Sequence, residues 1–359
     1  MRSAAALLCV VLAACSSTGS GDEPRATVPR ASASASGPTP APAPTGRTDA
    51  PPVVLAISVD GLNPDAIGLL GPAGLPTLHR LIDEGASTLN ARTSRELTIT
   101  LPNHTGMMTG RRVDGPRGTS VTFNEDDGRT LEAVHGEYVP GLFDVAHDRG
   151  VHTALFAEKD KFQFLVRSWD RAHGAADVTG TDEGRDKIDA AAIAPADELV
   201  DDVAAAMGGA GPRLVFWHLA APDVAGHANG WLTPAYLAAV RETDRRIGQV
   251  LATLDADPAL AARTTIILTA DHGGPRDQRQ HGDATLVADY RIPFVVWGRG
   301  VSPGTDLYAL DGTRADPGGG RPGYAGPQPI RNLDVADTAL GLLGLPELPD
   351  AAGRRVVVS

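Results

Sequence analysis

The chain has 359 residues, a formal net charge of −12 and 42% hydrophobic residues. This length allows one large α/β domain or two ordinary ones, and the hydrophobic content suffices for a substantial core. Nucleic-acid binding is not expected, because the charge is acidic and only 4% of residues are aromatic. An anionic substrate would therefore have to be attracted locally, by metal ions, helix ends or a few lysines.

The N-terminus predicts export. Arg2 precedes an apolar segment, Ala4 to Ala14, that is too short to span a bilayer as a mature helix. The segment resembles a bacterial lipoprotein signal, residues 1–15, in which cleavage before Cys15 leaves a lipidated cysteine; an ordinary secretory signal is the alternative. Residues 16–52 are rich in Ser, Thr, Ala, Pro and Gly and predict a disordered tether. We therefore expect a cell-surface or periplasmic lipoprotein, bound to the membrane only through its lipid anchor.

From residue 53 to 359, short apolar runs alternate with helical patterns. This alternation predicts one α/β domain with a largely parallel sheet. In chain order, strands are expected at residues 53–59, 151–157, 213–219, 264–269 and 292–297. Helices are expected at 64–84, with a break near Gly71, and at 141–149, 195–207, 233–255 and 334–343. The Gly- and Pro-rich residues 302–328 predict a long loop.

Residues 98–110, TITLPNHTGMMTG, predict an extended segment that turns into a helix at Thr100. Pro102 fixes its own φ and disfavours a helical conformation at Leu101, so Thr100 should end the extended segment. The helix start would offer free N–H groups to an anion. A threonine hydroxyl is a poor nucleophile unless a neighbouring group activates it, and the alternative is that Thr100 only begins a helix.

Acidic residues follow three of the expected strands: Asp60, Asp223 and Asp271. Because parallel strands end at one rim of an open sheet, these carboxylates should lie close together. His227 stands four residues after Asp223, and His272 directly follows Asp271. His281 comes nine residues after His272. Carboxylate and imidazole groups are ligands of Zn²⁺, Mn²⁺ or iron. Each residue alone could be a cap or turn residue, but together with Thr100 they predict a two-metal site that activates the hydroxyl.

The remaining histidines are expected to be structural. His218 lies within an apolar strand and is expected to be packed in the core. The other five have no carboxylate at ligand spacing and are assigned no role: His79, His135, His147, His152 and His173.

In this order the residues resemble the alkaline phosphatase superfamily, and within it the nucleotide pyrophosphatase/phosphodiesterase branch. The matching motifs are Asp60-Gly61, Thr100-Leu-Pro-Asn103-His104 with Thr109-Gly110, Asp223-x-x-x-His227, Asp271-His272-Gly273 and His281-Gly282. The resemblance runs from about Val53 to Pro346. It implies an alkaline-phosphatase-like three-layer sandwich with a central, mostly parallel sheet.

Position by position, the resemblance implies two divalent metal ions, with zinc as the expected element. One ion would be held by Asp60, Thr100, Asp271 and His272, and the other by Asp223, His227 and His281. Thr100 would be the nucleophile that becomes phosphorylated, and Asn103 would donate a hydrogen bond to a non-bridging phosphate oxygen. His104 would be a support residue, and Asn124 is a weaker match to a substrate-binding asparagine.

Two lysines, Lys159 and Lys161, follow the strand at 151–157 and are expected near the same rim as substrate contacts. They would favour a monoester dianion over a diester. Threonine-nucleophile monoesterases of the superfamily have a Lys-x-Arg pair in a comparable place, and Lys161 cannot make the bidentate contact of an arginine. The alternative is that both lysines are solvated in a loop and have no role in substrate binding. Asn103, by contrast with the lysines, favours a diester substrate.

These residues predict a two-metal hydrolase of a small-molecule phosphate ester or nucleotide, foremost a phosphodiesterase or nucleotide pyrophosphatase. A phosphomonoesterase of the same superfamily is the first alternative. Sulfatases share the fold, but their nucleophile is a modified Cys or Ser in a Cys/Ser-x-Pro-x-Arg motif, where this chain has Thr100. A non-catalytic solute-binding surface lipoprotein would share the signal and tether, but would not need a hydroxyl among metal ligands.

Overall fold

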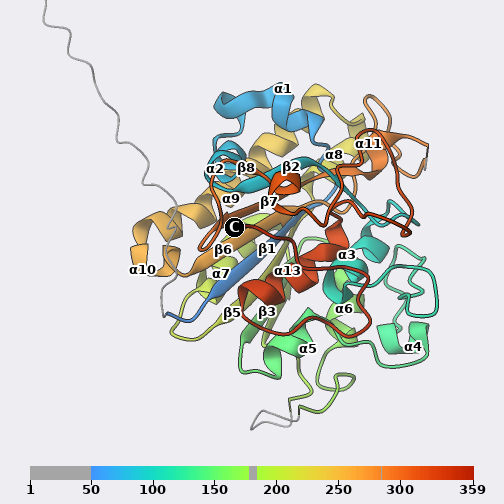
Figure 1. The fold of residues 1–359 in the computed structure, drawn as a ribbon, viewed down its shortest axis with the longest axis vertical. Helices are drawn as coiled ribbons and strands as arrows, with labels where there is room; N and C mark the ends of the chain where they lie inside the picture. Colours follow the sequence, from blue (N-terminus) through green and yellow to red (C-terminus); the bar gives the residue numbers. More distant parts are fainter. Residues whose placement is uncertain (1–49, 178–183, 284) are drawn as a thin grey trace, which may run out of the picture. The chain divides into compact units, whose positions relative to one another are not determined.

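The computed structural model describes residues 50–177, 184–283 and 285–359, so Cys15 and the expected signal and tether up to residue 49 lie outside the described residues. The described chain from residue 50 belongs to one compact unit. Its centre is an eight-stranded sheet with the order β4-β3-β5-β1-β6-β7-β2-β8 (Figure 1). The strands are β1 (Val53–Val59), β2 (Ala86–Arg92), β3 (His152–Ala157), β4 (Ala190–Ile193), β5 (Arg213–Leu219), β6 (Thr264–Thr269), β7 (Arg291–Gly298) and β8 (Thr305–Asp306).

The middle of the sheet is parallel and buried on both faces. β1 pairs in parallel with β5 on one side and with β6 on the other, and β3 and β4 continue the parallel pairing beyond β5. Every residue of β1 and β6 is buried, as expected for strands covered on both faces. The predicted mostly parallel sheet is therefore confirmed. The strand expected at 292–297 is its antiparallel member, because β7 runs against both β6 and β2.

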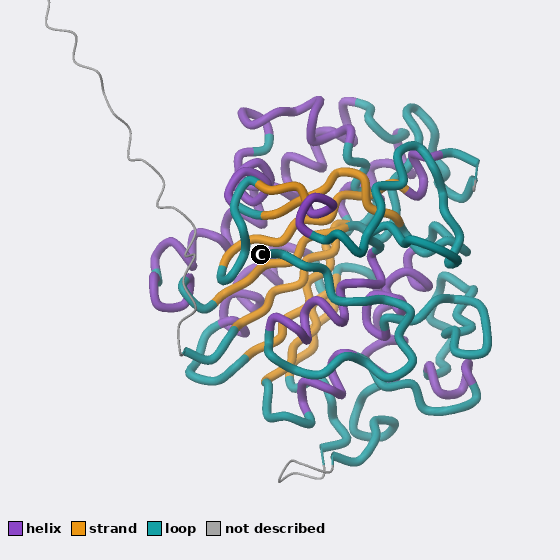
Figure 2. Tube along the Cα trace, in the orientation of Figure 1, coloured by secondary structure: helices purple, strands orange, loops and turns teal. Residues whose placement is uncertain are grey.

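Helices enclose the sheet in two layers (Figures 1 and 2). In one layer α2 (Pro76–Glu84) and α7 (Ala196–Met207) both contact α9 (Pro234–Ala256). In the other, α3 (Thr100–Thr109), α5 (Leu142–His147) and α13 (Val335–Leu342) contact one another, and α13 lies against β1 and β6. The expected three-layer sandwich is therefore confirmed. No helix within the described ranges is long and apolar enough to cross a membrane.

The remaining described helices pack around these elements. They are α1 (Asp65–Gly74), α4 (Leu131–His135), η1 (Asp160–Phe162), α6 (Gln163–Ser168), α8 (Ala221–Asn229), α10 (Pro258–Ala261), α11 (Val287–Tyr290), α12 (Leu307–Leu310) and η2 (Asn332–Asp334). The helical stretch expected at 64–84 is divided at Leu75, and Gly71, with φ of 59°, kinks α1. The expected loop at 302–328 contains β8 and α12.

Among the elements missing from the sequence-based expectation are β2, β4 and α8. β2 has a mixed polar and apolar sequence, and the alanine-rich β4 has little strand propensity of its own, so both depend on pairing with neighbouring strands. α8 contains Pro222 and Gly226, which weaken a helical pattern, although Pro222 stands in the first turn where proline is tolerated. α8 matters most, because it carries two of the expected ligands.

Candidate active site

Three carboxylates meet at one rim because the three central strands end at the same level. β1 is in register with β5 and with β6, so the chain leaves all three strands side by side. Asp60 follows β1, Asp223 lies in the first turn of α8 directly after β5, and Asp271 follows β6. The three residues are buried, at 0%, 4% and 0% exposed. The structure therefore brings together the three acids that the sequence placed at strand ends.

Each of the three expected histidine ligands is oriented by a backbone carbonyl. The Nδ1 atoms of His227, His272 and His281 lie 2.8, 2.8 and 2.6 Å from the carbonyl oxygens of Arg279, Gly273 and Thr98, respectively. Because a carbonyl oxygen can only accept, Nδ1 carries the proton and Nε2 is left with a lone pair. This arrangement is typical of metal-binding histidines.

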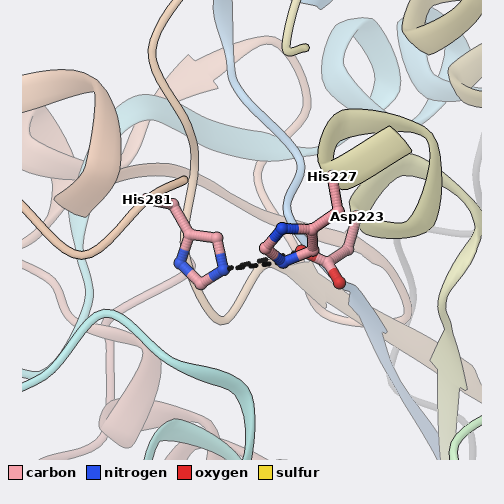
Figure 3. A group of neighbouring side chains, drawn as sticks. All are labelled: Asp223, His227 and His281. Carbon is pink, nitrogen blue, oxygen red and sulfur yellow. Dashed lines mark hydrogen bonds and ion pairs between the residues drawn. The ribbon is translucent and has the colours of Figure 1, made fainter. Parts of the chain in front are cut away.

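Two of these lone pairs face each other. Nε2 of His281 lies 3.2 Å from Nε2 of His227, and the rings point toward one another from α8 and the loop after β6 (Figure 3). Asp223 Oδ1 lies 3.4 Å from Nε2 of His227 and 3.8 Å from Nε2 of His281. Three electron-pair donors this close together could hold a cation among them. Asp223, His227 and His281 form one group with ligand atoms within 4.8 Å of one another.

A second group lies beside the first. His272 Nε2 is 3.4 Å from Asp60 Oδ1, 3.3 Å from Asp271 Oδ2 and 3.7 Å from Asp223 Oδ1. All four atoms are buried and have no hydrogen-bond partner among the described residues. The ligand atoms of Asp60, Asp223 and His272 also lie within 4.8 Å of one another, so Asp223 belongs to both groups. The family resemblance assigns Asp223 to one metal, and in the structure its Oδ1 lies within reach of both groups of candidate ligands.

One ammonium group lies against these carboxylates. Lys159 Nζ is 2.6 Å from Asp60 Oδ2 and 2.6 Å from Asp223 Oδ2. Burial opposes ionisation of Asp60, but the Lys159 charge and the hydrogen bond from His218 outweigh it, so the pKa of Asp60 is well below its usual range. Burial and the neighbouring Asp60 charge raise the pKa of Asp271 to about 7. Three buried carboxylates with one lysine leave an uncompensated negative charge, which divalent cations would neutralise.

Thr100 begins α3 beside this rim, as expected. Ile99 is extended, with φ of −125° and ψ of 158°, and Thr100 is 2% exposed. The Thr98 hydroxyl donates to the His281 carbonyl at 2.5 Å, which joins this segment to a candidate metal ligand. His104 Nδ1 donates to the Thr100 carbonyl at 2.8 Å, so His104 supports the threonine from within α3.

Asn103 has its amide fully engaged inside the protein. Its Oδ1 accepts from the Ser94 N–H at 3.0 Å and from Asn332 Nδ2 at 2.9 Å. Its Nδ2 donates to the carbonyls of Leu97 at 2.8 Å and Ile99 at 2.9 Å. An amide has two donors and two acceptor lone pairs, so no donor is left in this arrangement for the phosphate contact expected from sequence. Asn103 instead joins the strand-end loop to α3.

Asn124 lies at the start of the same helix. Its Oδ1 accepts from the Leu101 N–H at 2.9 Å. Pro102 has no N–H, and the Asn103 N–H bonds to the Ile99 carbonyl, so the first turn of α3 offers fewer free donors to an anion than the sequence predicts. Lys161 lies 3.2 Å from Glu125, away from the carboxylates that Lys159 contacts. The two expected substrate lysines are therefore in different environments.

Two further residues support the site without a signal in the sequence. His218 was expected to be packed in an apolar strand, and it is fully buried, but its Nε2 lies 2.9 Å from Asp60 Oδ2. Trp231 is buried beside His227 and His281, at 5.2 and 5.4 Å between ring centroids, and its indole N–H donates to the Gly61 carbonyl at 2.9 Å. Both roles depend on contacts between distant segments, which residue spacing cannot reveal.

The sheet and its helical layers share the fold of a Vibrio parahaemolyticus protein described as belonging to the alkaline phosphatase superfamily, with a TM-score of 0.52 and 15% identity over 87% of this chain and 71% of that one. A sequence model described as "Type I phosphodiesterase / nucleotide pyrophosphatase" matches residues 54–284. The chain belongs to this family. The resemblance read from the motifs is thereby confirmed.

Similar proteins share the fold at low identity. The structure of murine ectonucleotide pyrophosphatase/phosphodiesterase 5, an inactive form in complex with AMP, aligns with a TM-score of 0.55 and 14% identity, covering 82% of this chain and 96% of that one. Rat steryl-sulfatase is 36% identical over 37% of this chain and 22% of its own length. The 2,3-bisphosphoglycerate-independent phosphoglycerate mutase of Rhodopirellula baltica is 25% identical over 62% of this chain and 36% of its own. The chain thus matches only about a fifth to a third of these curated relatives.

Proposed function

We propose that this protein is a metal-dependent hydrolase of phosphate esters, acting as a phosphodiesterase or nucleotide pyrophosphatase through a phospho-threonine intermediate. The observation that carries the proposal is the convergence of buried electron-pair donors without partners among the described residues, from Asp60, Asp223, Asp271 and His272. His104, which bonds to the Thr100 carbonyl and lies 3.8 Å from Asp271, links this group to the start of α3. Family membership supports the reaction class, and the orientation of three histidine Nε2 atoms supports the metal requirement.

The donor set fits two divalent ions, for which we propose zinc. It contains imidazole nitrogens and carboxylate oxygens, which Zn²⁺ accepts as ligands. Asp60, Thr100, Asp271 and His272 would hold one ion, and His227 and His281 the other, with Asp223 reaching both groups. When bound, such ions lower the pKa of a coordinated hydroxyl and stabilise negative charge on the phosphate oxygens.

The chain's own residues account for the two halves of the reaction. Thr100 Oγ1 attacks phosphorus and releases its proton to solvent while the bond to the leaving oxygen breaks; that oxygen takes up a proton from solvent, which gives an alcohol or nucleotide product and phospho-threonine. Water then attacks the same phosphorus, the bond to Thr100 breaks, and the hydroxyl is restored. His104 holds the Thr100 backbone during both steps. The Asn124 amide is placed at the start of α3, where its Nδ2 would donate to a phosphate oxygen.

The substrate proposed is a small phosphodiester or nucleotide, with a phosphomonoester as the alternative. Lys159 is the observation that favours the alternative, because its ammonium group already lies at the rim and would attract a dianion. A sulfatase is disfavoured, despite the steryl-sulfatase similarity, because Thr100 stands at the nucleophile position. We also propose that the protein is exported and anchored through Cys15, a residue outside the described part of the chain.

The metal content and Thr100→Ala test this function together. The purified protein should contain about two transition-metal ions per chain, and Thr100→Ala should abolish hydrolysis of aryl phosphate esters while preserving the fold. Thr105→Ala is the matched control, because within the described part of the chain the Thr105 hydroxyl bonds to the Leu101 carbonyl of its own helix, α3. Comparing rates on a bis-aryl diester, an aryl monoester and a nucleotide would then assign the substrate class.

Two results would reject the proposal. A metal-free protein that binds no zinc would favour a solute-binding lipoprotein. Wild-type turnover by Thr100→Ala would reject the phospho-threonine mechanism.

A further inference from the structure

The two oxygens of the Asp60 carboxylate face different surroundings. Oδ1 is buried, lies 3.4 Å from His272 Nε2 and has no hydrogen-bond partner among the described residues. Oδ2 accepts from His218 Nε2 at 2.9 Å and from Lys159 Nζ at 2.6 Å. A carboxylate held in this way through one oxygen presents the other in a fixed direction.

We propose that His218 is a positioning residue that holds Asp60 in the orientation required of a metal ligand. The inference rests on the proposed metal site and assigns to a residue of β5 a function that its apolar strand does not indicate. His218 does not itself reach the candidate metal positions, since its ring nitrogens are both used elsewhere. It acts through its hydrogen bond to Oδ2 of Asp60.

The hydrogen bonds of His218 define which nitrogen carries its proton. The Glu158 N–H points at His218 Nδ1 from 3.4 Å, so Nδ1 accepts. Nε2 therefore carries the proton and donates it to Asp60, and the neutral ring satisfies both of its nitrogens. This is the arrangement in which a histidine orients a carboxylate without adding a charge that would repel a metal ion.

Packing prevents the His218 ring from turning away. The residue is 0% exposed, and its ring lies 4.4 Å from Phe162 and 5.0 Å from His104, measured between centroids. Asp60 is also 0% exposed, so water cannot replace the histidine at Oδ2. Loss of the N–H donor would leave Lys159 as the remaining donor to that oxygen. Lys159 also bonds to Asp223, and its flexible chain defines a direction less well than a packed ring.

Two amide substitutions separate this role from simple packing. The Gln side chain places its NH₂ near the position of His Nε2, whereas the shorter Asn places it near Nδ1. Titration of the metal-free proteins with Zn²⁺ should show that His218→Asn weakens one of the two sites about 10- to 100-fold, as for other residues that orient metal ligands. His218→Gln should stay within a few-fold of wild type. The measurement is zinc affinity, so it does not depend on turnover.

Phe162→Leu is the control for packing, because it removes ring contact with His218 and leaves the hydrogen bond to Asp60 in place. It should bind zinc as wild type does. Equal affinity of wild type and His218→Asn, or equal weakening in Phe162→Leu and His218→Asn, would overturn the positioning role. A wild-type protein that binds no zinc would instead overturn the proposed metal site, and this inference with it.

Discussion

At the scale of single residues, the site is decided by which polar atoms already have partners. Both ends of the Asn103 amide are occupied, whereas Asn124 uses its oxygen at the start of α3. The two asparagines stand near the same threonine, but their contacts give them different roles. Asn103 holds the fold around the site, and Asn124 is the better candidate for a phosphate contact.

This difference predicts opposite effects of two similar substitutions. Asn103→Ala should lower the free energy of unfolding by about 2–4 kcal/mol, because it leaves buried partners without hydrogen bonds. Asn124→Ala should cost less stability, about 1 kcal/mol for the one Leu101 N–H that loses its acceptor, and should reduce kcat/KM about 10- to 100-fold, as expected for one hydrogen bond to a charged group. Urea unfolding and steady-state kinetics measure the two effects. A large kinetic loss with full stability in Asn103→Ala would restore Asn103 as the substrate contact.

Lys159 and Lys161 also differ in their partners, which are buried for Lys159 and exposed for Lys161. Lys159 contacts two buried carboxylates, so Lys159→Met in the metal-free protein leaves them without a cation and should cost about 3–5 kcal/mol of stability. Lys161 is paired with Glu125, whose side chain is 85% exposed, and Lys161→Met should cost less than about 1 kcal/mol. Added zinc should recover most of the loss in Lys159→Met. Equal stabilities of the two metal-free variants would show that Lys159 does not compensate the carboxylates.

At the scale of elements, the site depends on close packing between α8, the loop after β6 and Trp231. A Cβ on Gly274 would lie 2.3 Å from Trp231 Cδ2, and one on Gly226 would lie 2.6 Å from the same indole. Trp231 in turn packs beside His227 and His281. The two glycines therefore allow the indole to lie directly beside the candidate metal ligands His227 and His281.

Gly274→Ala should consequently displace the Trp231 indole and, through it, His227 and His281. Displacement of the indole should cost about 1–3 kcal/mol of stability and weaken zinc binding. Gly282→Ala is the matched control, because Gly282 directly follows His281 and a Cβ there meets nothing within 4 Å. Thermal unfolding and zinc titration of both variants measure the difference. Gly274→Ala with wild-type zinc affinity would mean that Trp231 does not position the histidines.

At the scale of the whole molecule, buried carboxyl groups away from the site make stability depend on pH. Asp144, at the start of α5, is 4% exposed and accepts hydrogen bonds from the Tyr138 hydroxyl and the Gly141 N–H. Burial outweighs these bonds and raises the pKa of Asp144 from 3.8 to about 6. Between these values the folded protein binds more protons than the unfolded chain, so stability falls as pH rises from about 4 to about 6.

Asp144→Asn should remove this contribution. The decrease in unfolding free energy between pH 4 and pH 7 should be smaller in the variant than in wild type, by at most about 3 kcal/mol. Parallel denaturant unfolding of both proteins at the two pH values gives the difference directly. An identical pH dependence would show that folding does not raise the pKa of Asp144.

Local pattern predicted much of the fold. The strands β1, β5 and β6 are continuous apolar runs, and α9 has clear helical periodicity, so each has enough local signal to be read from the sequence. β2, β4 and α8 were missed because their stability comes from neighbouring elements and not from their own residues.

The sequence by itself determined the chemistry available at the rim. Strand-end acids, nearby histidines and the threonine before a helix follow from residue order, because parallel strands must end on one side. Only the tertiary structure decided which atoms remain free. In the folded protein the Asn103 amide is fully hydrogen-bonded, and Asp223 lies between two groups of candidate ligands. Lys159 bonds to the carboxylates, and His218 bonds to Asp60. These are hydrogen bonds between segments far apart in the chain, and they are determined by packing, which spacing along the sequence does not encode.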